Sequence, residues 1–477
     1  MAAASSNVQP MNDQLCAPPS DLFPTLERKS SNYDRLPDLA DKLVIKDRLF
    51  RQQYASIYFV RLHKLRPFVK AAADERWANL PDRPQYLPKV LDATEKRCYI
   101  IGTIYVDMAL KPNILHDLSA ESSIVAPPLP KKYKGSDDKV AIEDESGRIQ
   151  LVGAAVSQEF WVTGIVVGLL GKETSAGQFE VQEVCLPGIA PQLSIPKSIS
   201  SEKKYVAILS GLSIGADANL DLKTQLLTEF LSGELGSPAE QTSSASICRV
   251  ILAGNSVARR KVEEDTKKPK KYGYDATRYD ATPMLQLDEF LEEICGTVPV
   301  DVMSGPQDPI NRHLPQQRLN SALFQRARKL NTFQTVTNPY WAKIDDVVLL
   351  GTAGQNIDDL YKYTDSENRL SVAERCLFWR HMAPSAPDTL WCYPFQDRDP
   401  FLLEQSPHVY FIGNQSQFEQ SLIEGPEGQK IRVVLVPSFA ETGLIVLLDL
   451  ATLECTTVRI ADDKNPQPDV APMDTSE

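Results

Sequence analysis

The motif G-x-S-x-G at residues 211–215 is the strongest enzyme signal in the sequence, with Ser213 at its centre. It follows the apolar run YVAILS, as a nucleophile elbow follows a strand, and Asp388 and His408 come later in the order that hydrolases use. An elbow needs a helix that begins at the serine, whereas residues 215–218, Gly-Ala-Asp-Ala, delay the helix, and His408 starts a strand. We therefore expect a Gly-rich turn here, with a serine hydrolase acting through Ser213 as the alternative function.

A second set of turns follows predicted strands in the order that metallophosphoesterases use. Those enzymes hold two metal ions with D-x-H, G-D, G-N-H-D or G-N-H-E, and G-H-x-H, because hard divalent cations need carboxylate and imidazole ligands. Here the turns are kept and the ligands are not. The residues at the ligand positions are Gly211, Ser213, Asn255, Pro306, Gln307, Asp308, Asn414 and Ser416. Because only Asp308 is acidic, the sequence predicts no metal, no cofactor and no catalytic residue at this site.

Composition excludes several other classes of protein. The net charge of -12 and the pI of about 5.1 argue against a phosphate backbone as the main partner. The longest apolar stretches fall far short of the roughly 20 residues that a bilayer span needs, and the N-terminus lacks the features of a secretory signal. Eight cysteines without a C-x-x-C pair favour free thiols over a zinc or iron-sulfur site. We expect a soluble protein in a reducing compartment.

The first 80 residues divide into an arm and a helical region. Residues 1–40 are rich in Ser, Pro, Asn and Asp, which predicts a disordered arm. Over residues 41–80 we expect an amphipathic helix region, in which apolar side chains recur at helical spacing until Arg66-Pro67 ends the run. The candidate subunit contacts on this helix are Tyr54, Ile57, Tyr58 and Leu62.

The next segment, residues 90–195, predicts a small barrel. About five short β-type runs are separated by Gly, Asp and Ser turns, which suits an OB-fold. Single-strand binding by such a barrel needs a basic groove with exposed aromatic side chains. Acidic residues, including residues 143–145, lie among the aromatic ones in this segment, so we expect these aromatic side chains to pack within the barrel and at a subunit contact.

Residues 200–460 predict an α+β domain. Apolar runs such as YVAILS, CRVILAG and VPVDVM alternate with helices at about 220–231 and 284–295, which is typical of a sheet covered by helices. Two insertions, at about 236–246 and 258–283, are expected to be exposed loops. The second holds the basic run from Lys267 to Lys271, either a solvated loop or a nuclear-import or DNA-facing patch. Residues 461–477 predict an acidic disordered tail.

Eight stretches between about residues 48 and 460 carry a resemblance that metal chemistry does not explain. They are RQQYASIYFVRLHKLRPF, RVILAGN, VPVDVMSGPQDP, LPQQ, VTNPY, LGTAGQN, APSAPDTLWCYPF and PHVYFIGN. In these stretches and their order the chain resembles the family of small regulatory (B) subunits of DNA polymerase delta. The resemblance implies an OB-fold packed on a calcineurin-like phosphoesterase domain, a layered β-sandwich flanked by helices, that lacks its metal ligands.

The resemblance also implies a role without catalysis. It predicts a nuclear scaffold for DNA replication and repair synthesis that joins the Cys-rich C-terminal module of the catalytic subunit to the third subunit of the holoenzyme. The sliding clamp would be reached through that assembly, DNA would be contacted weakly and indirectly, and no membrane would be involved. The aromatic run WCYPF supplies further candidate contacts: Trp391, Tyr393 and Phe395.

Overall fold

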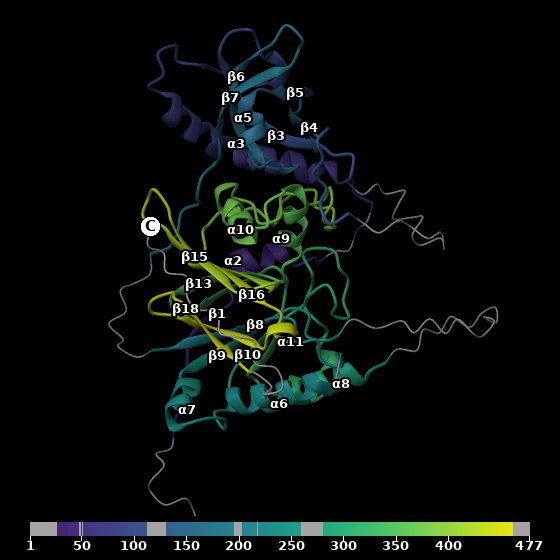
Figure 1. The fold of residues 1–477 in the computed structure, drawn as a ribbon, viewed down its shortest axis with the longest axis vertical. Helices are drawn as coiled ribbons and strands as arrows, with labels where there is room; N and C mark the ends of the chain where they lie inside the picture. Colours follow the sequence, from purple (N-terminus) through teal and green to yellow (C-terminus); the bar gives the residue numbers. More distant parts are fainter. Residues whose placement is uncertain are drawn as a thin grey trace, which may run out of the picture.

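The computed structural model of the chain describes residues 26–46, 49, 51–111, 130–194, 203–216, 218–258 and 280–460. These residues form a barrel stacked on two further sheets along the long axis of the molecule (Figure 1). The predicted disorder of residues 1–25, the insertion at 259–279 with its basic run, and the acidic tail at 461–477 lie outside the described residues. Within the described ranges, no helix is both long and apolar enough to cross a membrane.

The barrel follows from the short strands that the sequence predicts. Its elements are β2 (Gln85–Leu87), η2 (Val90–Asp92), β3 (Cys98–Asp107), β4 (Lys139–Glu143), β5 (Arg148–Val152), α5 (Ala154–Gln158), β6 (Val166–Glu173) and β7 (Phe179–Cys185). The strand order is β2-β3-β4-β5-β7-β6, and a further pairing of β3 with β6 closes the sheet. Buried apolar side chains such as Ile100, Ile142 and Leu169 form its core. The prediction of a small closed barrel is confirmed.

The helix before the barrel, α3 (Ala55–Trp77), is longer than the sequence predicts. The predicted end at Pro67 is wrong, because Pro67 lies inside the helix. A proline removes one helical hydrogen bond. The helix nevertheless continues, since Val69, Ala73 and Trp77 bury one of its faces against β3, β6 and β7 of the barrel.

Below the barrel lie two six-stranded sheets. Their strands are β1 (Tyr33–Asp34), β8 (Tyr205–Leu209), β9 (Ile247–Ala253), β10 (Val300–Met303), β11 (Phe333–Val336), β12 (Tyr340–Ile344), β13 (Val347–Thr352), β14 (Val409–Gln415), β15 (Glu419–Glu424), β16 (Lys430–Pro437), β17 (Leu444–Asp449) and β18 (Cys455–Arg459). One sheet has the order β1-β12-β13-β14-β16-β15 and the other the order β11-β10-β9-β8-β17-β18. Ile208 and Ile251 of the second sheet share one buried cluster with Leu349 and Phe411 of the first, so the two sheets pack face to face.

Helices cover the outer face of each sheet. The helical elements are α2 (Pro37–Ala40), η1 (Asp41–Leu43), α6 (Ala218–Ser232), α7 (Pro238–Ala245), α8 (Thr282–Cys295), η3 (Ser321–Leu323), η4 (Ala327–Lys329), α9 (Gln355–Leu360), η5 (Tyr361–Tyr363), α10 (Arg369–Phe378) and α11 (Phe439–Thr442). Figure 1 shows α6, α7 and α8 along the bottom of the molecule, and α9 and α10 between the barrel and the nearer sheet. The predicted helices near 220–231 and 284–295 correspond to α6 and α8. The expectation of an α+β domain is therefore confirmed.

Two segments that the sequence analysis treats as irregular are ordered. Within the predicted arm, Tyr33 and Asp34 pair with β12, and the Arg28 guanidinium donates hydrogen bonds to the carbonyls of Ser244 and Ile247. Within the predicted loop at 236–246, the structure has the helix α7. Its N-terminus is a capping box, in which Ser237 and Glu240 bond reciprocally to each other's backbone N–H. The S-x-x-E pattern was the signal for this helix, and it outweighs the polar composition of the segment.

Candidate functional site

Most of the predicted ligand positions meet at one edge of the sandwich, where β8, β9, β10 and β14 end. The Gly211 N–H donates to the Gly254 carbonyl at 2.9 Å, and the Ser213 N–H donates to the Asn255 carbonyl at 3.0 Å. The Asn414 side chain donates to the carbonyls of Ala253 and Ala353 at 3.2 and 3.0 Å. The Gln307 N–H donates to the Asn255 side chain at 3.0 Å. One position stands apart, because Ser416 is exposed beyond the end of β14.

Backbone conformation marks the same edge as unusual. Gly211, Ser213, Asn255 and Asn414 have φ angles of 62°, 50°, 55° and 56°. Residues other than glycine adopt this left-handed region rarely, and such residues gather at binding and catalytic sites in proteins. These turns therefore carry local backbone strain at one edge of the sandwich.

The single acidic residue at this edge, Asp308, serves the backbone. Its carboxylate accepts hydrogen bonds from the N–H groups of Gly305, Asn255 and Val257 at 2.7, 2.9 and 3.1 Å. Burial raises the pKa of Asp308 to about 6, although these backbone hydrogen bonds lower it. Both oxygens are thus occupied by the turns that they hold together.

Neutral amides connect the remaining strand ends. The Asn338 side chain donates to the side-chain oxygens of Gln316 and Gln355 at 2.8 and 2.9 Å, and it accepts from the Ala353 N–H at 3.1 Å. Gln355 also donates to Gln316 at 2.8 Å. An amide both donates and accepts, so these groups satisfy one another without an ion. We call this group the strand-end cluster: Gly211, Asn255, Asp308, Gln316, Asn338, Gln355 and Asn414.

Neither kind of enzyme site is assembled in the described part of the chain. No group of three His, Cys, Asp or Glu residues there lies close enough to hold a metal ion. In the hydrolase alternative, both ring nitrogens of His408 are engaged by the backbone, at the Val348 N–H and the Leu193 carbonyl. Asp388 contacts Tyr363 and Lys111 instead of His408. The structure therefore gives Ser213 no base, and the serine hydrolase reading is unsupported.

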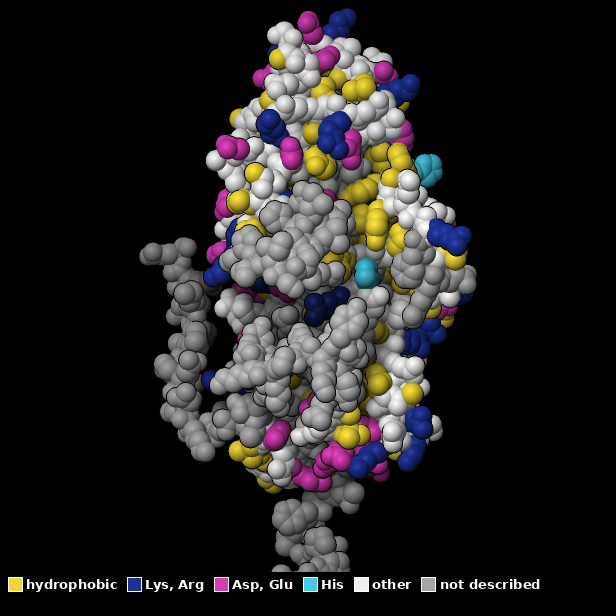
Figure 2. Space-filling view, turned by 90° about the vertical axis from the view of Figure 1, so that its right-hand side faces the viewer, with side chains coloured by type: hydrophobic (Ala, Val, Ile, Leu, Met, Phe, Trp, Pro, Cys, Tyr) yellow, Lys and Arg dark blue, Asp and Glu magenta, His cyan; other side chains and the backbone are white. Residues whose placement is uncertain are grey.

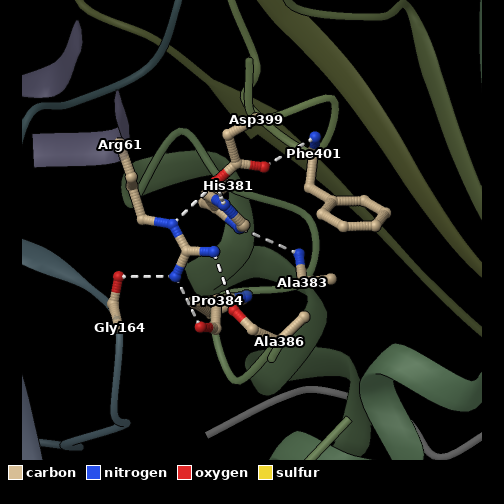
Figure 3. A network of polar contacts seen from close by, with 8 residues as sticks. All are labelled: Arg61, Gly164, His381, Ala383, Pro384, Ala386, Asp399 and Phe401. Carbon is tan, nitrogen blue, oxygen red and sulfur yellow. Dashed lines mark hydrogen bonds and ion pairs between the residues drawn. The ribbon is translucent and has the colours of Figure 1, made fainter. Parts of the chain in front are cut away.

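A second buried polar site joins the barrel to the sandwich, and its centre is the fully buried Arg61 of α3 (Figure 3). The Arg61 guanidinium donates to the Asp399 carboxylate at 2.7 Å. It also donates to the carbonyl of Gly164 in the barrel at 3.1 Å. The carbonyls of Pro384 and Ala386, at 2.7 and 2.8 Å, complete its partners. One side chain thus ties together the helix, the barrel and the loops above the sandwich.

His381 completes this second site. Its Nδ1 accepts from the Ala383 N–H at 3.1 Å, so Nε2 carries the proton that is donated to Asp399 at 2.8 Å. Burial, together with the Arg61 charge, lowers the pKa of His381 to about 4. Although burial alone would raise it, the pKa of Asp399 is held below its usual value by His381 and Arg61. We call Arg61, Gly164, His381 and Asp399 the barrel junction.

Further contacts reinforce the barrel junction. Arg380 donates to the carbonyls of Gly188 and Ile189, both at 2.9 Å, and Arg375 pairs with Glu159 of the barrel at 3.2 Å. Sequence reasoning missed the junction. The signal was present, because Ile57, Arg61 and Leu65 recur every fourth residue on the buried face of α3. An arginine at the centre of such a face requires a buried carboxylate partner.

The predicted contact residues divide into buried and exposed ones. Ile57 and Leu62 are buried in this chain, as are Tyr393 and Phe395. Tyr58 is largely enclosed, and burial raises its pKa. Tyr54 and Trp391 are exposed. An external partner can therefore reach about half of the surface of two of these seven side chains, while the others serve internal packing.

Comparison with known proteins gives consistent matches along the chain. A family model described as the DNA polymerase delta subunit OB-fold domain matches residues 53–184. A second family model, which describes the B subunit of DNA polymerases alpha and epsilon, matches residues 206–420. The first match confirms that the barrel is an OB-fold.

Similar whole chains carry a related description. The chain is 43% identical to the DNA polymerase delta small subunit of Arabidopsis thaliana, over 92% of this chain and 98% of the relative. It is 35% identical to that of Saccharomyces cerevisiae, over 88% and 91%. A more distant relative is the DNA polymerase II small subunit of Methanothermobacter thermautotrophicus, 22% identical over 60% of this chain and 58% of the relative.

Proposed function

The chain belongs to the family of DNA polymerase delta small subunits, and from this premise we propose that it is a non-catalytic scaffold of that replicative polymerase. It binds the Cys-rich C-terminal module of the catalytic subunit and the third subunit, and through that assembly it works with the sliding clamp in the nucleus. The two-sheet domain is a calcineurin-like phosphoesterase domain that has lost catalysis.

The observation that carries this proposal is the chemistry of the strand-end cluster. A two-metal phosphoesterase needs several carboxylate and imidazole ligands around a bridging carboxylate. At the corresponding turns the Asn414 side-chain nitrogen donates to two backbone carbonyls, the Asn255 side-chain oxygen accepts from a backbone N–H, and Asp308 is saturated by backbone N–H groups. Such a site holds strands together but generates no hydroxide nucleophile.

The barrel junction supports the positive half of the proposal. A scaffold must present its partners in one fixed orientation, and a fully buried arginine bonded to both domains resists their relative rotation. The proposed domains are the helix region at 41–80, the OB-fold at 90–195 and the inactive phosphoesterase domain at 200–460.

Two measurements test the proposal. Co-expression with the C-terminal region of the catalytic subunit and with the third subunit should yield a heterotrimer that survives gel filtration at moderate salt. The purified chain should contain no stoichiometric manganese, zinc or iron by elemental analysis and should not hydrolyse a bis-aryl phosphate. A wild-type chain that binds neither subunit, or a hydrolase activity that disappears in Asp308→Ala, contradicts the proposal.

A further inference from the structure

Three apolar side chains from separate elements are exposed around one aromatic loop. Leu49 is 58% exposed, Trp391 is 56% exposed and Tyr54 is 45% exposed. The Tyr393 hydroxyl accepts from the Leu49 N–H at 3.0 Å and donates to its carbonyl at 2.8 Å, which fixes Leu49 against the loop. Tyr54 follows Leu49 by five residues and precedes α3. We call Leu49, Tyr54 and Trp391 the Trp391 surface.

Figure 2 shows a band of hydrophobic side chains that passes two histidines on one face of the molecule. Of the four histidines in the described residues, only His63 and His313 are not buried. The His313 ring lies 5.5 Å from that of Trp391, and His63 lies on α3, eight residues after Ala55. His313 and Trp391 therefore lie side by side.

A groove lies on each side of Tyr393. One has a volume of about 610 Å³ and includes Ile45, Leu49 and Phe395 among its lining residues. The other has a volume of about 500 Å³ and includes Ile45, Ile310 and Leu323. Each is large enough for one or two side chains of a partner, and apolar anchors seated in such recesses provide most of the affinity of a protein interface.

The second groove is basic, because Arg318 lines it and no acidic residue does. The first groove is balanced in charge, with Asp38, Asp41 and Asp397 among its lining residues beside Lys42, Lys46 and Arg398. Residues 309–331, which supply most of the second groove, contain five Lys and Arg residues (312, 318, 326, 328 and 329) and no Asp or Glu. This local excess contrasts with the net charge of -12 for the whole chain. A surface patch of opposite sign to its protein indicates an oppositely charged partner.

Part of this positive charge is neutralised within the chain, since Arg326 pairs with Glu289 and Glu292. Lys42 and Lys64 share one carboxylate, that of Glu404. No ion pair with another described residue engages Lys46, Arg312 or Arg318. Burial and the neighbouring Arg35 guanidinium lower the pKa of Arg318, which lines the second groove. An external carboxylate beside Arg318 would relieve this repulsion between like charges.

The apolar character of the grooves separates a polypeptide from a nucleic acid. A single strand is bound by stacking its bases on aromatic side chains along an open basic groove. Here the apolar lining residues of the recesses include the aliphatic side chains of Ile45, Ile310 and Leu323, which suit Leu, Phe or Met side chains. The aromatic lining residues, Tyr393 and Phe395, are buried and expose little ring surface for stacking. The net charge of -12 also opposes the counterion release that drives DNA binding.

We propose that the Trp391 surface, with its two grooves and basic margin, docks an acidic polypeptide segment that carries apolar anchors. This proposal rests on the scaffold function, because the segment belongs to one of the subunits that the scaffold holds. The anchors occupy the grooves beside Tyr393, and the carboxylates of the segment lie against Lys46, Arg312 and Arg318.

A photo-cross-link in the assembled complex tests the location. The photoreactive residue p-benzoyl-phenylalanine replaces Trp391 in the chain co-purified with both other subunits, and the matched control replaces Leu285, an equally exposed leucine on α8. Position 391 should cross-link to a subunit segment with more Asp and Glu than Lys and Arg, and position 285 should not cross-link to that segment. Adding a single-stranded oligonucleotide to the reaction should give no cross-link to DNA.

Charge reversal tests the chemistry. The double variant Lys46→Glu with Arg318→Glu should weaken binding of the cross-linked subunit at least about tenfold, because it replaces attraction by repulsion on both grooves. Lys139→Glu, at an exposed barrel lysine, should leave binding within twofold. Circular dichroism shows whether the double variant is folded. If the double variant is unfolded, the cross-link from position 391 in the chain without the charge reversals decides the question.

The outcomes separate this proposal from the scaffold function. An intact complex without a cross-link from position 391 overturns the docking surface and leaves the scaffold standing. A cross-link to DNA, to a second copy of this chain or to a basic segment also overturns the docking surface alone. A wild-type chain that captures neither subunit overturns both proposals.

Discussion

The strand-end cluster and the barrel junction are both buried polar sites, but their chemistry is opposite. The strand-end cluster connects its strands through neutral amides of Asn338, Gln316 and Gln355. The barrel junction uses a full charge on Arg61 against Asp399. Burying a charge costs several kcal/mol unless every partner is in place, whereas paired amides cost much less. The buried ion pair of Arg61 and Asp399 therefore lies where the two domains meet, whereas the buried carboxylate of Asp308 at the strand ends is held by backbone N–H groups.

The comparison teaches what each site is for. An edge whose amides bond to one another and to the backbone connects its strands without an ion. A buried arginine with four protein partners specifies one arrangement of two domains, since no other arrangement satisfies it. The first site retains a scaffold, and the second fixes the relative positions of its parts.

Removing Arg61 should have the largest effect on stability. Arg61→Met leaves Asp399 buried beside His381 without its cation, and it leaves the carbonyls of Gly164, Pro384 and Ala386 without a donor. We expect a loss of about 3–5 kcal/mol in the free energy of unfolding, measured by urea denaturation. Arg66→Met is the control, because Arg66 pairs with Glu145 at the surface and should cost less than about 1 kcal/mol. Equal losses in both variants would remove the distinction between the junction and a surface ion pair.

Lowering the pH should change the free energy of unfolding in opposite directions at the two sites. His381 has a pKa of about 4 in the folded chain, against 6.5 ordinarily. Between pH 6.5 and 4 the unfolded chain therefore binds a proton that the folded chain does not bind, and the free energy of unfolding falls as the pH drops. Asp308 has a pKa of about 6 against 3.8, so its folded state takes up the proton first, and stability rises as pH drops from 6 to 4. The two contributions oppose each other in the wild-type chain.

His381→Gln should expose this opposition. Relative to the wild type, the variant should gain about 3 kcal/mol in the free energy of unfolding as pH falls from 6.5 to 4, because the histidine no longer favours the unfolded state. Urea titrations at pH 6.5, 5 and 4 measure the difference. His63→Gln, at an exposed histidine, should run parallel to the wild type. A difference between His381→Gln and the wild type that does not change with pH contradicts a neutral, buried His381.

The sequence predicts regular elements well where hydrophobic periodicity and packing agree. The runs at β8, β9 and β10 are apolar except for Arg249 and Asp301, because helices or a second sheet cover both faces, and the sequence shows this directly. The end of α3 could not be predicted by local rules, because the packing of Val69, Ala73 and Trp77 on the barrel overrides Pro67. The strand β1 has two residues and depends entirely on its partner β12.

Of the two candidate sites, local sequence patterns predict one and miss the other. The strand-end positions could be found because their turns follow strands, and turn residues such as Gly211 and Asn414 stand close to apolar runs. The barrel junction joins residues 61, 164, 381 and 399, and no local pattern relates positions so far apart. Tyr393 and Phe395 were predicted as contacts from aromatic composition alone, which does not distinguish an exposed ring from a buried one.

Gly164→Ala should disturb the junction by shape alone. Gly164 has a φ of 96°, and an added Cβ would lie 2.2 Å from the Pro384 carbonyl oxygen and 2.5 Å from the Arg61 guanidinium. We expect a loss of about 2 kcal/mol in the free energy of unfolding, since both the backbone and the close contact are strained. Gly177→Ala is the matched control, because its φ is also positive but no atom lies within 4 Å of the added Cβ. If both substitutions lower the free energy of unfolding by the same amount, backbone strain explains the loss and the close approach at the junction does not.

Asn338→Ala tests the strand-end cluster in the same way. It removes the donor to Gln316 and Gln355 and leaves the Ala353 N–H without its acceptor. The expected loss is about 1–2 kcal/mol, smaller than that of Arg61→Met, because the orphaned groups are neutral. Gln225→Ala, on the exposed face of α6, should change stability by less than about 0.5 kcal/mol. A loss as large as that of Arg61→Met would show that disrupting the amides destabilises the chain as much as disrupting the ion pair does.

The smallest effect, close to zero, is expected from metal ions. If the amides replace the metal in holding the strand ends, neither EDTA nor added manganese should move the melting temperature of the wild-type chain by more than about 1 °C, because an ion that does not bind the folded state cannot stabilise it.

Introducing one acidic side chain at a ligand position should not create a metal site. An Asp side chain at residue 211 would start from a Cβ only 2.6 Å from the Ser438 hydroxyl oxygen and 3.0 Å from the Asn414 side-chain oxygen, on a backbone with a φ of 62°. Gly211→Asp is therefore expected to destabilise the chain without creating metal-dependent stabilisation, and thermal melts with and without manganese measure both. A melting temperature that rises with manganese in either chain would show that the strand-end cluster still binds an ion. Both buried polar sites would then depend on a charged group, and the contrast between neutral and charged sites would fail.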